Sequence, residues 1–251
     1  MSPSAVSDPH VLSSGKVWVP LENNPSVMTK LAHRLGLSDD LEFVDVYSVT
    51  EDSLMAMVPR PVYAILWLFP ITKNSEEALA EEDAGMALYD GSGANEPVLW
   101  FRQTVGHACG LMGMLHCIIN GEAAAHITPG SELDKLVDKA IPAKPDARAQ
   151  QVYDSEFLEI AHAEAAHGGD SNVPLPSDPV PYGFTAFVKG KDGHLWELEG
   201  RRKGPVDRGL LGPDEDILSE RVLGLSVYPY INREKVDESR FSCTALVTAD
   251  K

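Results

Sequence analysis

Residues 101–113 of the chain are FRQTVGHACGLMG, and residues 114–120 continue this stretch as MLHCIIN. The polar, glycine-bearing start followed by an almost wholly apolar run predicts a turn that leads into a helix buried on most sides. Cys109 lies where the turn meets the helix. A helix N-terminus favours an anion, because its free backbone N–H groups and its dipole stabilise negative charge, so a thiol there is expected to have a lowered pKa. We therefore treat Cys109 as a candidate nucleophile.

The neighbours of Cys109 suit the same chemistry. Gly106 and Gly110 are expected to let the backbone turn sharply and approach a substrate closely. Gln103 precedes Cys109 at a spacing that can place its side-chain amide beside a developing oxyanion, together with the amide of Cys109 itself. The alternative is that Cys109 is a small core residue and Gln103 a turn residue, because a lone cysteine near a helix start is weak evidence. The residues alone leave both interpretations open.

Composition limits the classes of partner. The 251 residues are 43% hydrophobic, enough for one sizeable core or two small ones. The formal net charge of -17 makes nucleic acids and anionic membrane surfaces poor partners, and favours a basic partner or a basic peptide tail. An acidic surface that only maintains solubility is an equally good explanation of this charge.

Cysteine usage and hydropathy indicate a soluble protein of a reducing compartment. Cys109, Cys117 and Cys243 have spacings that suit neither a disulfide framework nor a metal site, so we expect no bound metal and no cofactor. The longest apolar run, residues 61–71, is too short to span a bilayer, and the N-terminus does not resemble a secretion signal. These features predict a cytoplasmic location.

The hydrophobic periodicity predicts one α+β domain over residues 16–251, preceded by a disordered tail over residues 1–15. The predicted strands are residues 16–20, 41–49, 62–69, 98–102, 183–189, 194–198 and 241–247. The predicted helices are residues 27–35, 53–57, 75–86, the stretch that follows the turn within 103–120, two polar stretches at 129–149 and 151–166, and 216–223. Residues 168–181 form a Pro/Ser/Asp-rich loop of a length often found in lids.

The segment 101–113 strongly resembles the active-site motif of the ubiquitin carboxyl-terminal hydrolases, a family of papain-like cysteine peptidases. Further segments look like family segments in the family's order, and the resemblance covers about residues 16–250. They are FVDV at 43–46, LFPI at 68–71, DGHLWELEGR at 192–201, GP at 204–205 and RFS at 240–242. The resemblance implies a single papain-like domain with a central antiparallel sheet flanked by helices, and a knotted backbone, which general rules on chain threading disfavour. Residues 168–181 fall at the family's crossover loop, which restricts the active site to slim or flexible leaving groups.

The resemblance assigns roles to three residues. Cys109 would be the nucleophile and Gln103 the oxyanion-hole donor. Glu199, within ELEGR at 197–201, stands where the family has an aspartate that orients the catalytic histidine. A glutamate keeps that charge but places it one methylene further out, which is compatible with orienting an imidazolium.

The family's histidine has no counterpart in the matching segment, VPYGFTAF at 180–187. Alignment of the strand aromatics puts Gly183 at that position, and counting back from the acid puts Phe184 there, and neither can act as a base. His107, two positions before Cys109, is the nearest candidate for a relocated base, although a solvent-facing loop side chain is the alternative, because proximity in sequence does not set geometry.

The other histidines offer weaker candidates. His162 and His167 border the crossover region, and a flexible loop can bring His167 inward. His194 and His116 are expected to have structural roles, and no argument favours His10, His33 or His126. If no imidazole lies within hydrogen-bond reach of the Cys109 sulfur, the relocated base is excluded.

Loss of the base should reduce activity severely, because general acid–base assistance contributes roughly 10²- to 10⁴-fold. Three functions remain open. The first is a divergent thiol enzyme that uses Cys109 to hydrolyse or transfer the acyl group of a thioester, ester or amide, with ubiquitin, a ubiquitin-like protein, or a small or carrier-bound molecule as substrate. The second is a non-catalytic ubiquitin-binding protein, and the third an ordinary deubiquitinating cysteine peptidase. The oligomeric state is not set by the sequence.

Overall fold

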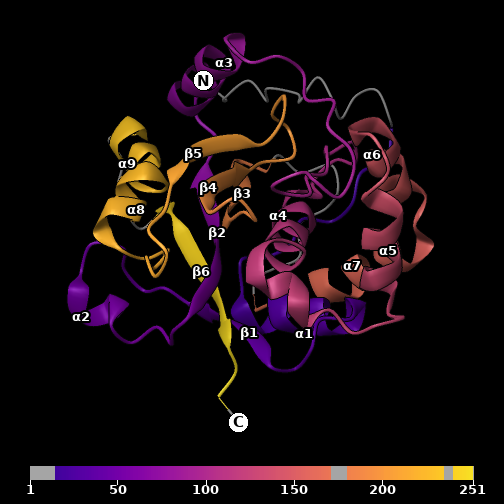
Figure 1. The fold of residues 1–251 in the computed structure, drawn as a ribbon, viewed down its shortest axis with the longest axis horizontal. Coiled ribbons are helices and arrows are strands. Elements are labelled where there is room, and N and C mark those ends of the chain that lie inside the picture. The colour runs from indigo at the N-terminus through magenta and orange to yellow at the C-terminus, as the bar shows by residue number, and fades with distance from the viewer. Residues whose placement is uncertain (1–14, 171–179, 235–239, 251) are drawn as a thin grey trace.

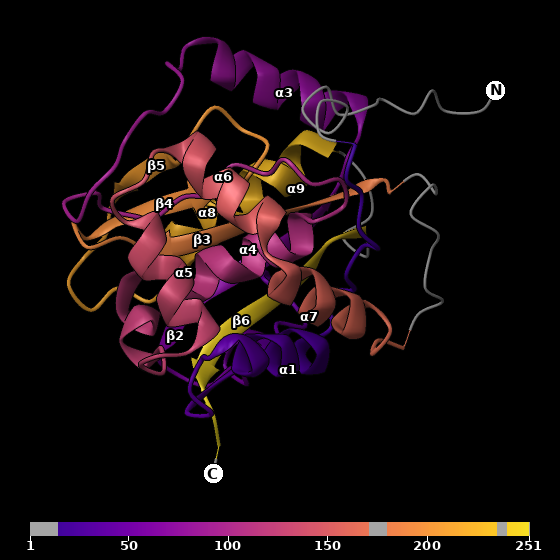
Figure 2. The same ribbon diagram turned by 90° about the vertical axis from the view of Figure 1, so that its right-hand side faces the viewer.

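The computed structural model describes residues 15–170, 180–234 and 240–250. Within them, six strands form one antiparallel sheet in the order β1-β6-β2-β3-β4-β5. Helices cover both faces: α1 and α4–α7 gather on one side, and α8 and α9 on the other (Figures 1 and 2). This confirms the predicted α+β domain with a central antiparallel sheet. No helix of the described part of the chain is long and apolar enough to cross a bilayer.

The strands have the following bounds: β1 Leu41–Asp45, β2 Val62–Pro70, β3 Tyr182–Lys189, β4 His194–Leu198, β5 Val206–Leu210 and β6 Ser242–Thr248. The helices are α1 Pro25–Leu35, α2 Asp52–Met55, α3 Lys73–Ala84, α4 Cys109–Ile118, α5 Glu132–Ala140, α6 Pro145–Asp154, α7 Glu156–Ala166, α8 Glu220–Leu225 and α9 Tyr228–Glu234, with a 3-10 helix at Gly121–His126. The strands predicted at 62–69, 183–189, 194–198 and 241–247 are confirmed to within about two residues at each end.

The strand β2 separates two hydrophobic cores. Leu66 packs in the core beneath α1 and α4, whereas Ile65 and Trp67 pack in the core beneath α8 and α9. Because neighbouring side chains of a strand point to opposite faces, a strand covered on both faces must be apolar throughout. The uninterrupted apolar run at 62–69 therefore predicted correctly that this strand is buried on both faces.

The helix α4 is buried against β2 and β3, as the apolar run predicted. Every residue of α4 after Cys109 is buried. Gly113 permits this close approach, since a Cβ at that position would lie 2.5 Å from Cδ1 of Leu66.

Residues 98–102 are not a strand, contrary to the prediction. They form an irregular buried segment whose backbone is hydrogen-bonded by side chains of the α4 region. Asn120 accepts from the N–H of Leu99 at 2.7 Å and donates to its carbonyl at 3.0 Å. Nε2 of His116 accepts from the N–H of Phe101 at 3.0 Å. These bonds replace a strand partner, and they give His116 the structural role expected for it.

Several other predicted boundaries were wrong. Residues 16–20 form only an isolated bridge between Val17 and Gly106, and the strand predicted at 41–49 ends at Asp45. The two polar stretches contain three helices, because Pro145 starts α6 and the hydroxyl of Ser155 caps α7. The strand β5 and the helix α9 were not predicted.

Some predictions fall outside the described residues. Residues 1–14 of the predicted tail, with His10, lie there, as do residues 171–179 of the predicted crossover loop. The knot depends on the path of the chain through 171–179 and stays a prediction.

A buried carboxylate, Glu197 of β4, joins several elements on the α3 and α9 side of the sheet. Its side chain has no exposed surface and accepts hydrogen bonds from Arg208 Nε at 2.7 Å, the hydroxyl of Tyr230 at 2.5 Å and Arg202 Nη1 at 3.3 Å. Arg202 also contacts Asp83 at 2.5 Å, which links α3 to the segment after β4. A buried charge is stable only when it is paired and hydrogen-bonded.

Replacing this carboxylate should therefore be costly. Glu197→Ala leaves two mostly buried guanidinium groups short of negative charge, and we expect the free energy of unfolding in urea to fall by about 3–5 kcal/mol. The control is Glu77→Ala, which removes an exposed ion pair with Lys73 and should leave the unfolding curve unchanged. Equal small effects of the two variants would show that the cluster does not stabilise the fold.

Candidate active site

Cys109 is the first residue of α4, preceded by Ala108 as the N-cap residue. This confirms the predicted place of Cys109 at the start of a helix. Its side chain is half-buried, and its sulfur is hydrogen-bonded by the backbone N–H groups of Gly110 and of Phe184 in β3. The sulfur therefore lies between the helix start and the first residues of β3.

The environment of the thiol differs from the one expected at a helix end. Burial raises the pKa of Cys109 above its ordinary value, and the carboxylate of Glu199 raises it further. The guanidinium of Arg201 and the two backbone N–H groups oppose this increase of the pKa without cancelling it. The prediction of a lowered pKa is wrong, because desolvation of the sulfur outweighs the helix N-terminus.

Gln103 lies against the segment that carries Glu199. Its backbone N–H donates to the carbonyl of Gly200 at 2.8 Å, and a Cβ at residue 200 would lie 2.9 Å from the Cβ of Gln103. Its side chain is buried, with Nε2 donating to the carbonyl of Val105 at 3.1 Å. Only one of the two hydrogens on Nε2 is used in that bond, so the amide retains a donor.

Glu199 is buried and ion-paired with an arginine. Its Oε1 accepts from Nε of Arg201 at 2.6 Å and from the backbone N–H of the same residue at 3.3 Å. The structure thus brings Cys109, Gln103 and Glu199 into one site and adds Arg201, which the sequence analysis did not single out. The sequence signal that could have identified Arg201 is the ELEGR segment at 197–201, because it places an arginine two residues after the acid.

The space beside Gly183 is already filled. Gly183 pairs with Phe69 in the sheet, and a Cβ on Gly183 would lie 2.8 Å from Cζ of Phe69 and 2.9 Å from Nη2 of Arg201. The next residue, Phe184, turns its ring toward α4, where Cε2 lies 3.4 Å from the position of a Cβ on Gly110. An aromatic ring and a guanidinium therefore flank the position at which the resemblance expected a histidine.

His107 lies in the turn before α4 but faces the N-terminal segment. Its backbone has a φ of 59°, a left-handed conformation, so the sharp turn is made at His107 and not at Gly106. Its ring hydrogen-bonds the backbone of Trp18, and burial lowers its pKa. Both backbone groups of Gly106 are hydrogen-bonded, by the carbonyl of Lys16 and the N–H of Trp18, each at 2.9 Å.

The remaining histidines also have other partners or are remote. His162 contacts the carbonyl of Val19 at 2.6 Å, and His194 contacts Asp207 at 2.9 Å. His167 is exposed at the end of α7. Among the residues that the structure describes, no imidazole is hydrogen-bonded to the sulfur of Cys109, so the hypothesis of a relocated base gains no support.

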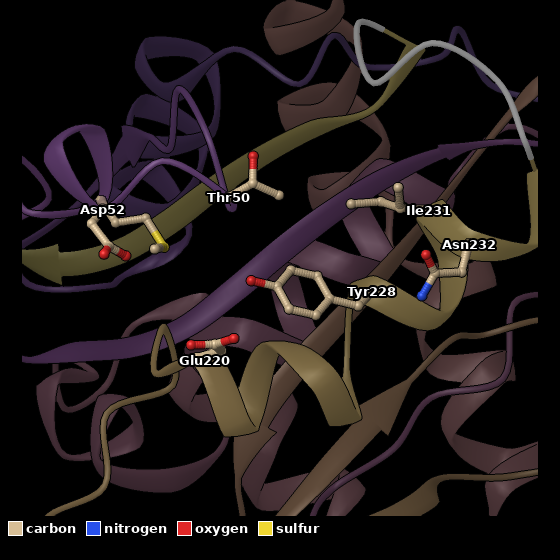
Figure 3. A pocket seen from close by; sticks show the side chains of 7 residues that line it. Thr50, Asp52, Glu220, Tyr228, Ile231 and Asn232 are labelled. Atoms are coloured by element: carbon tan, nitrogen blue, oxygen red, sulfur yellow. The ribbon is translucent and has the colours of Figure 1, made fainter.

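A hollow of about 430 Å³ lies away from this site, between α2, α8 and α9 (Figure 3). Its lining residues are Thr50, Asp52, Met55, Glu220, Tyr228, Ile231 and Asn232. No predicted site residue lines it.

Cys109 therefore begins a buried helix that packs on an antiparallel sheet, and Gln103 and Glu199 lie in the same region. Residues 18–225 match the family described as ubiquitin carboxyl-terminal hydrolase, family 1. The chain belongs to this family, the peptidase C12 family.

Known proteins agree with this assignment. The chain is 38% identical over 204 residues to ubiquitin carboxyl-terminal hydrolase 3 of Arabidopsis thaliana, covering 80% of this chain and 83% of the relative. It is 34% identical over 207 residues to a probable ubiquitin carboxyl-terminal hydrolase of Dictyostelium discoideum, covering 80% and 78%. The fold matches the Trichinella spiralis UCH37 catalytic domain, crystallised with ubiquitin vinyl methyl ester, with a TM-score of 0.74 at 17% identity, covering 96% of this chain and all of that one.

The raised pKa of Cys109 predicts a particular pH dependence. Because the thiolate is the nucleophile, the rate of Cys109 alkylation by iodoacetamide should rise about tenfold per pH unit from pH 7 to pH 9 without reaching a plateau. Mass spectrometry of the alkylated peptide measures this rate, and Cys109→Ser gives the background from Cys117 and Cys243, which are buried. A plateau near pH 7 would contradict the burial argument.

Proposed function

We propose that this protein takes the C-terminus of ubiquitin at Cys109 and forms an acyl-enzyme there, as a thiol hydrolase with a weakened ability to cleave amides. The observation that carries the proposal is the convergence of Cys109, Gln103 and Glu199 at the start of α4, with no imidazole bonded to the sulfur among the described residues. Family membership supports ubiquitin as the partner, and so does the ubiquitin derivative bound to the UCH37 domain. The net charge of -17 suits a basic C-terminal tail.

The geometry supports attack of the thiolate on the carbonyl carbon better than it supports expulsion of an amine leaving group. The thiolate of Cys109 attacks the carbonyl carbon, and the resulting oxyanion receives hydrogen bonds from the N–H of Cys109 and the spare hydrogen on Nε2 of Gln103. Expulsion of an amine then requires a proton on its nitrogen. Within the described residues no imidazole is in place to supply it, so amide substrates should react slowly.

The second candidate is a non-catalytic ubiquitin-binding protein. The ion pair between Glu199 and Arg201 favours it, since the acid is already neutralised, and so does the raised pKa of Cys109. A substrate unrelated to ubiquitin gains no support from the Arabidopsis and Dictyostelium relatives, which are described as a ubiquitin carboxyl-terminal hydrolase and a probable one.

A ubiquitin electrophile separates these candidates. Ubiquitin carrying a C-terminal vinyl methyl ester should form a covalent adduct with the wild-type protein and with Cys117→Ala, but not with Cys109→Ala. Mass spectrometry and a gel shift detect the adduct. Tight binding of ubiquitin without an adduct would favour the non-catalytic protein. Absence of both binding and adduct would overturn the proposal.

A histidine placed at residue 183 tests whether a base is the missing element. Gly183→His requires the ring of Phe69 and the guanidinium of Arg201 to move, and adds an imidazole one residue before Phe184, whose N–H binds the Cys109 sulfur. We expect turnover of a ubiquitin–aminocoumarin amide to rise roughly 10²- to 10⁴-fold.

The matched control is Gly183→Ala, whose Cβ meets the same ring of Phe69 and the same guanidinium of Arg201 without providing a base. Circular dichroism and thermal unfolding establish that both variants fold. If the histidine variant turns over the amide no faster than the alanine variant, loss of a base at residue 183 does not limit the reaction.

A further inference from the structure

His116 is a fully buried histidine that the proposed reaction does not use. It lies on α4, about two turns beyond the first residue of that helix, and has no exposed surface. Its Nε2 accepts from the N–H of Phe101 at 3.0 Å, and its Nδ1 lies 3.2 Å from the carbonyl oxygen of Leu198. One ring therefore connects the helix of the nucleophile to the segment before Gln103 and to the end of β4.

These two bonds determine where the ring of His116 carries its hydrogen. A backbone N–H can only donate, so the Nε2 that faces Phe101 is bare, and the hydrogen is on Nδ1, which donates to the carbonyl of Leu198. Burial lowers the pKa of His116 to about 4, so the ring is neutral near pH 7. The ring thus offers an acceptor to one segment and a donor to the other.

The side chain of Gln103 has little to hold it in place by itself. Its Nε2 donates to the carbonyl of Val105 in the same turn, at 3.1 Å, and its buried Oε1 has no hydrogen-bond partner among the described residues. Its backbone is better fixed, because its N–H donates to the carbonyl of Gly200 at 2.8 Å and His116 binds the N–H of Phe101, two residues earlier. The position of the amide therefore depends on the backbone that carries it.

Resting on the proposed function, we propose that His116 is a positioning residue for that reaction. It acts through Gln103, because it fixes the backbone before Gln103 relative to α4, the helix that begins with Cys109. A displacement of about 1 Å caused by a change far from the reacting atoms can cost about 10²-fold in rate. The oxyanion donor and the nucleophile belong to separate segments, and the ring of His116 joins these segments directly.

Two amide substitutions separate the two bonds of the ring. The side-chain nitrogen of asparagine lies as many bonds from Cα as Nδ1 of histidine, so His116→Asn can keep the donor to Leu198 but loses the acceptor for Phe101. The side-chain oxygen of glutamine lies as many bonds from Cα as Nε2, so His116→Gln can keep the acceptor but loses the donor. His116→Phe keeps a ring and loses both bonds. Because Gln103 is held through Phe101, glutamine should restore function and asparagine should not.

The test compares a reaction that uses the oxyanion hole with one that does not. A ubiquitin C-terminal aldehyde adds the Cys109 thiol: sulfur bonds to the aldehyde carbon, the electron pair of the carbonyl π bond moves to the oxygen, and the thiol proton ends on that oxygen. His116→Asn and His116→Phe should bind this aldehyde about 10²-fold more weakly than the wild type, and His116→Gln should stay within about tenfold. Alkylation of Cys109 by iodoacetamide forms no oxyanion, and its rate should not change in any of the three variants.

The matched control is Cys117→Ala, which alters the residue next to His116 on the same buried helix. Cys117 is fully buried and its sulfur contacts the carbonyl of Ile65 in β2 at 3.7 Å, not the segment of Gln103. It should bind the aldehyde as the wild type does, and thermal unfolding shows whether each variant folds. Equal aldehyde affinity of His116→Phe and the wild type would overturn the role. A loss in Cys117→Ala as large as that in His116→Phe would overturn it too, because any disturbance of α4 would then suffice.

A measurement without ubiquitin tests the placement of Gln103 even if the proposed function fails. The chain has three glutamines, Gln103, Gln150 and Gln151, so selective ¹⁵N-glutamine labelling gives three side-chain amide signals in NMR spectra. In His116→Asn the signal of Gln103 should shift or broaden, whereas the signals of Gln150 and Gln151, on α6, should stay. An unchanged Gln103 signal would overturn the role of His116.

The two proposals fail in different ways. If the wild type forms no adduct with the ubiquitin vinyl methyl ester and does not bind the aldehyde, the ubiquitin-directed function is overturned, and a shifted Gln103 signal in His116→Asn still supports the placement of Gln103 by His116. If the wild type forms the adduct and His116→Phe binds the aldehyde as tightly as the wild type does, the function is kept and the positioning role of His116 is overturned.

Discussion

The site depends on how a buried stretch of irregular backbone, residues 98–103, is hydrogen-bonded. No strand pairs with it, so its polar groups need other partners in the interior. His116 of α4 accepts from the N–H of Phe101 while its other ring nitrogen binds the carbonyl of Leu198, at the end of β4, at 3.2 Å. The N–H of Gln103 donates to the carbonyl of Gly200 at 2.8 Å. These bonds fasten α4, Gln103 and the segment that carries Glu199 to one another.

The same constraint explains why an acid and a cysteine far apart in the sequence lie in one site. Trp100 donates from Nε1 to the carbonyl of Glu199 at 3.2 Å, which fixes the backbone at the acid. Gly200 has no side chain, and any side chain there would collide with Gln103. The ELEGR segment can therefore lie directly on the turn that precedes α4, and the carboxylate of Glu199 enters the interior near the sulfur.

Two buried carboxylates of this segment, Glu197 and Glu199, have different arginine partners. Glu197 faces the α3 and α9 side, where Arg202, Arg208 and Tyr230 satisfy it. Glu199, two residues later, points toward Cys109 and pairs with Arg201. The contacts of Glu197 stabilise the fold, because a buried carboxylate must be paired and hydrogen-bonded.

The sequence by itself predicted the elements with a clear hydrophobic pattern and the motif at Cys109. The strand β2 and the helix α4 could be predicted because an element buried on all sides is apolar at nearly every position. That pattern can be recognised without knowing which segments the element packs against. The motif placed Cys109, Gln103 and Glu199 in order along the chain. Only the tertiary structure decided that residues 98–102 are not a strand, that His107 faces Trp18, and that Arg201 occupies the space beside Gly183. Each of these depends on contacts between segments distant in sequence, and desolvation, which raises the pKa of Cys109, exists only once those segments have packed.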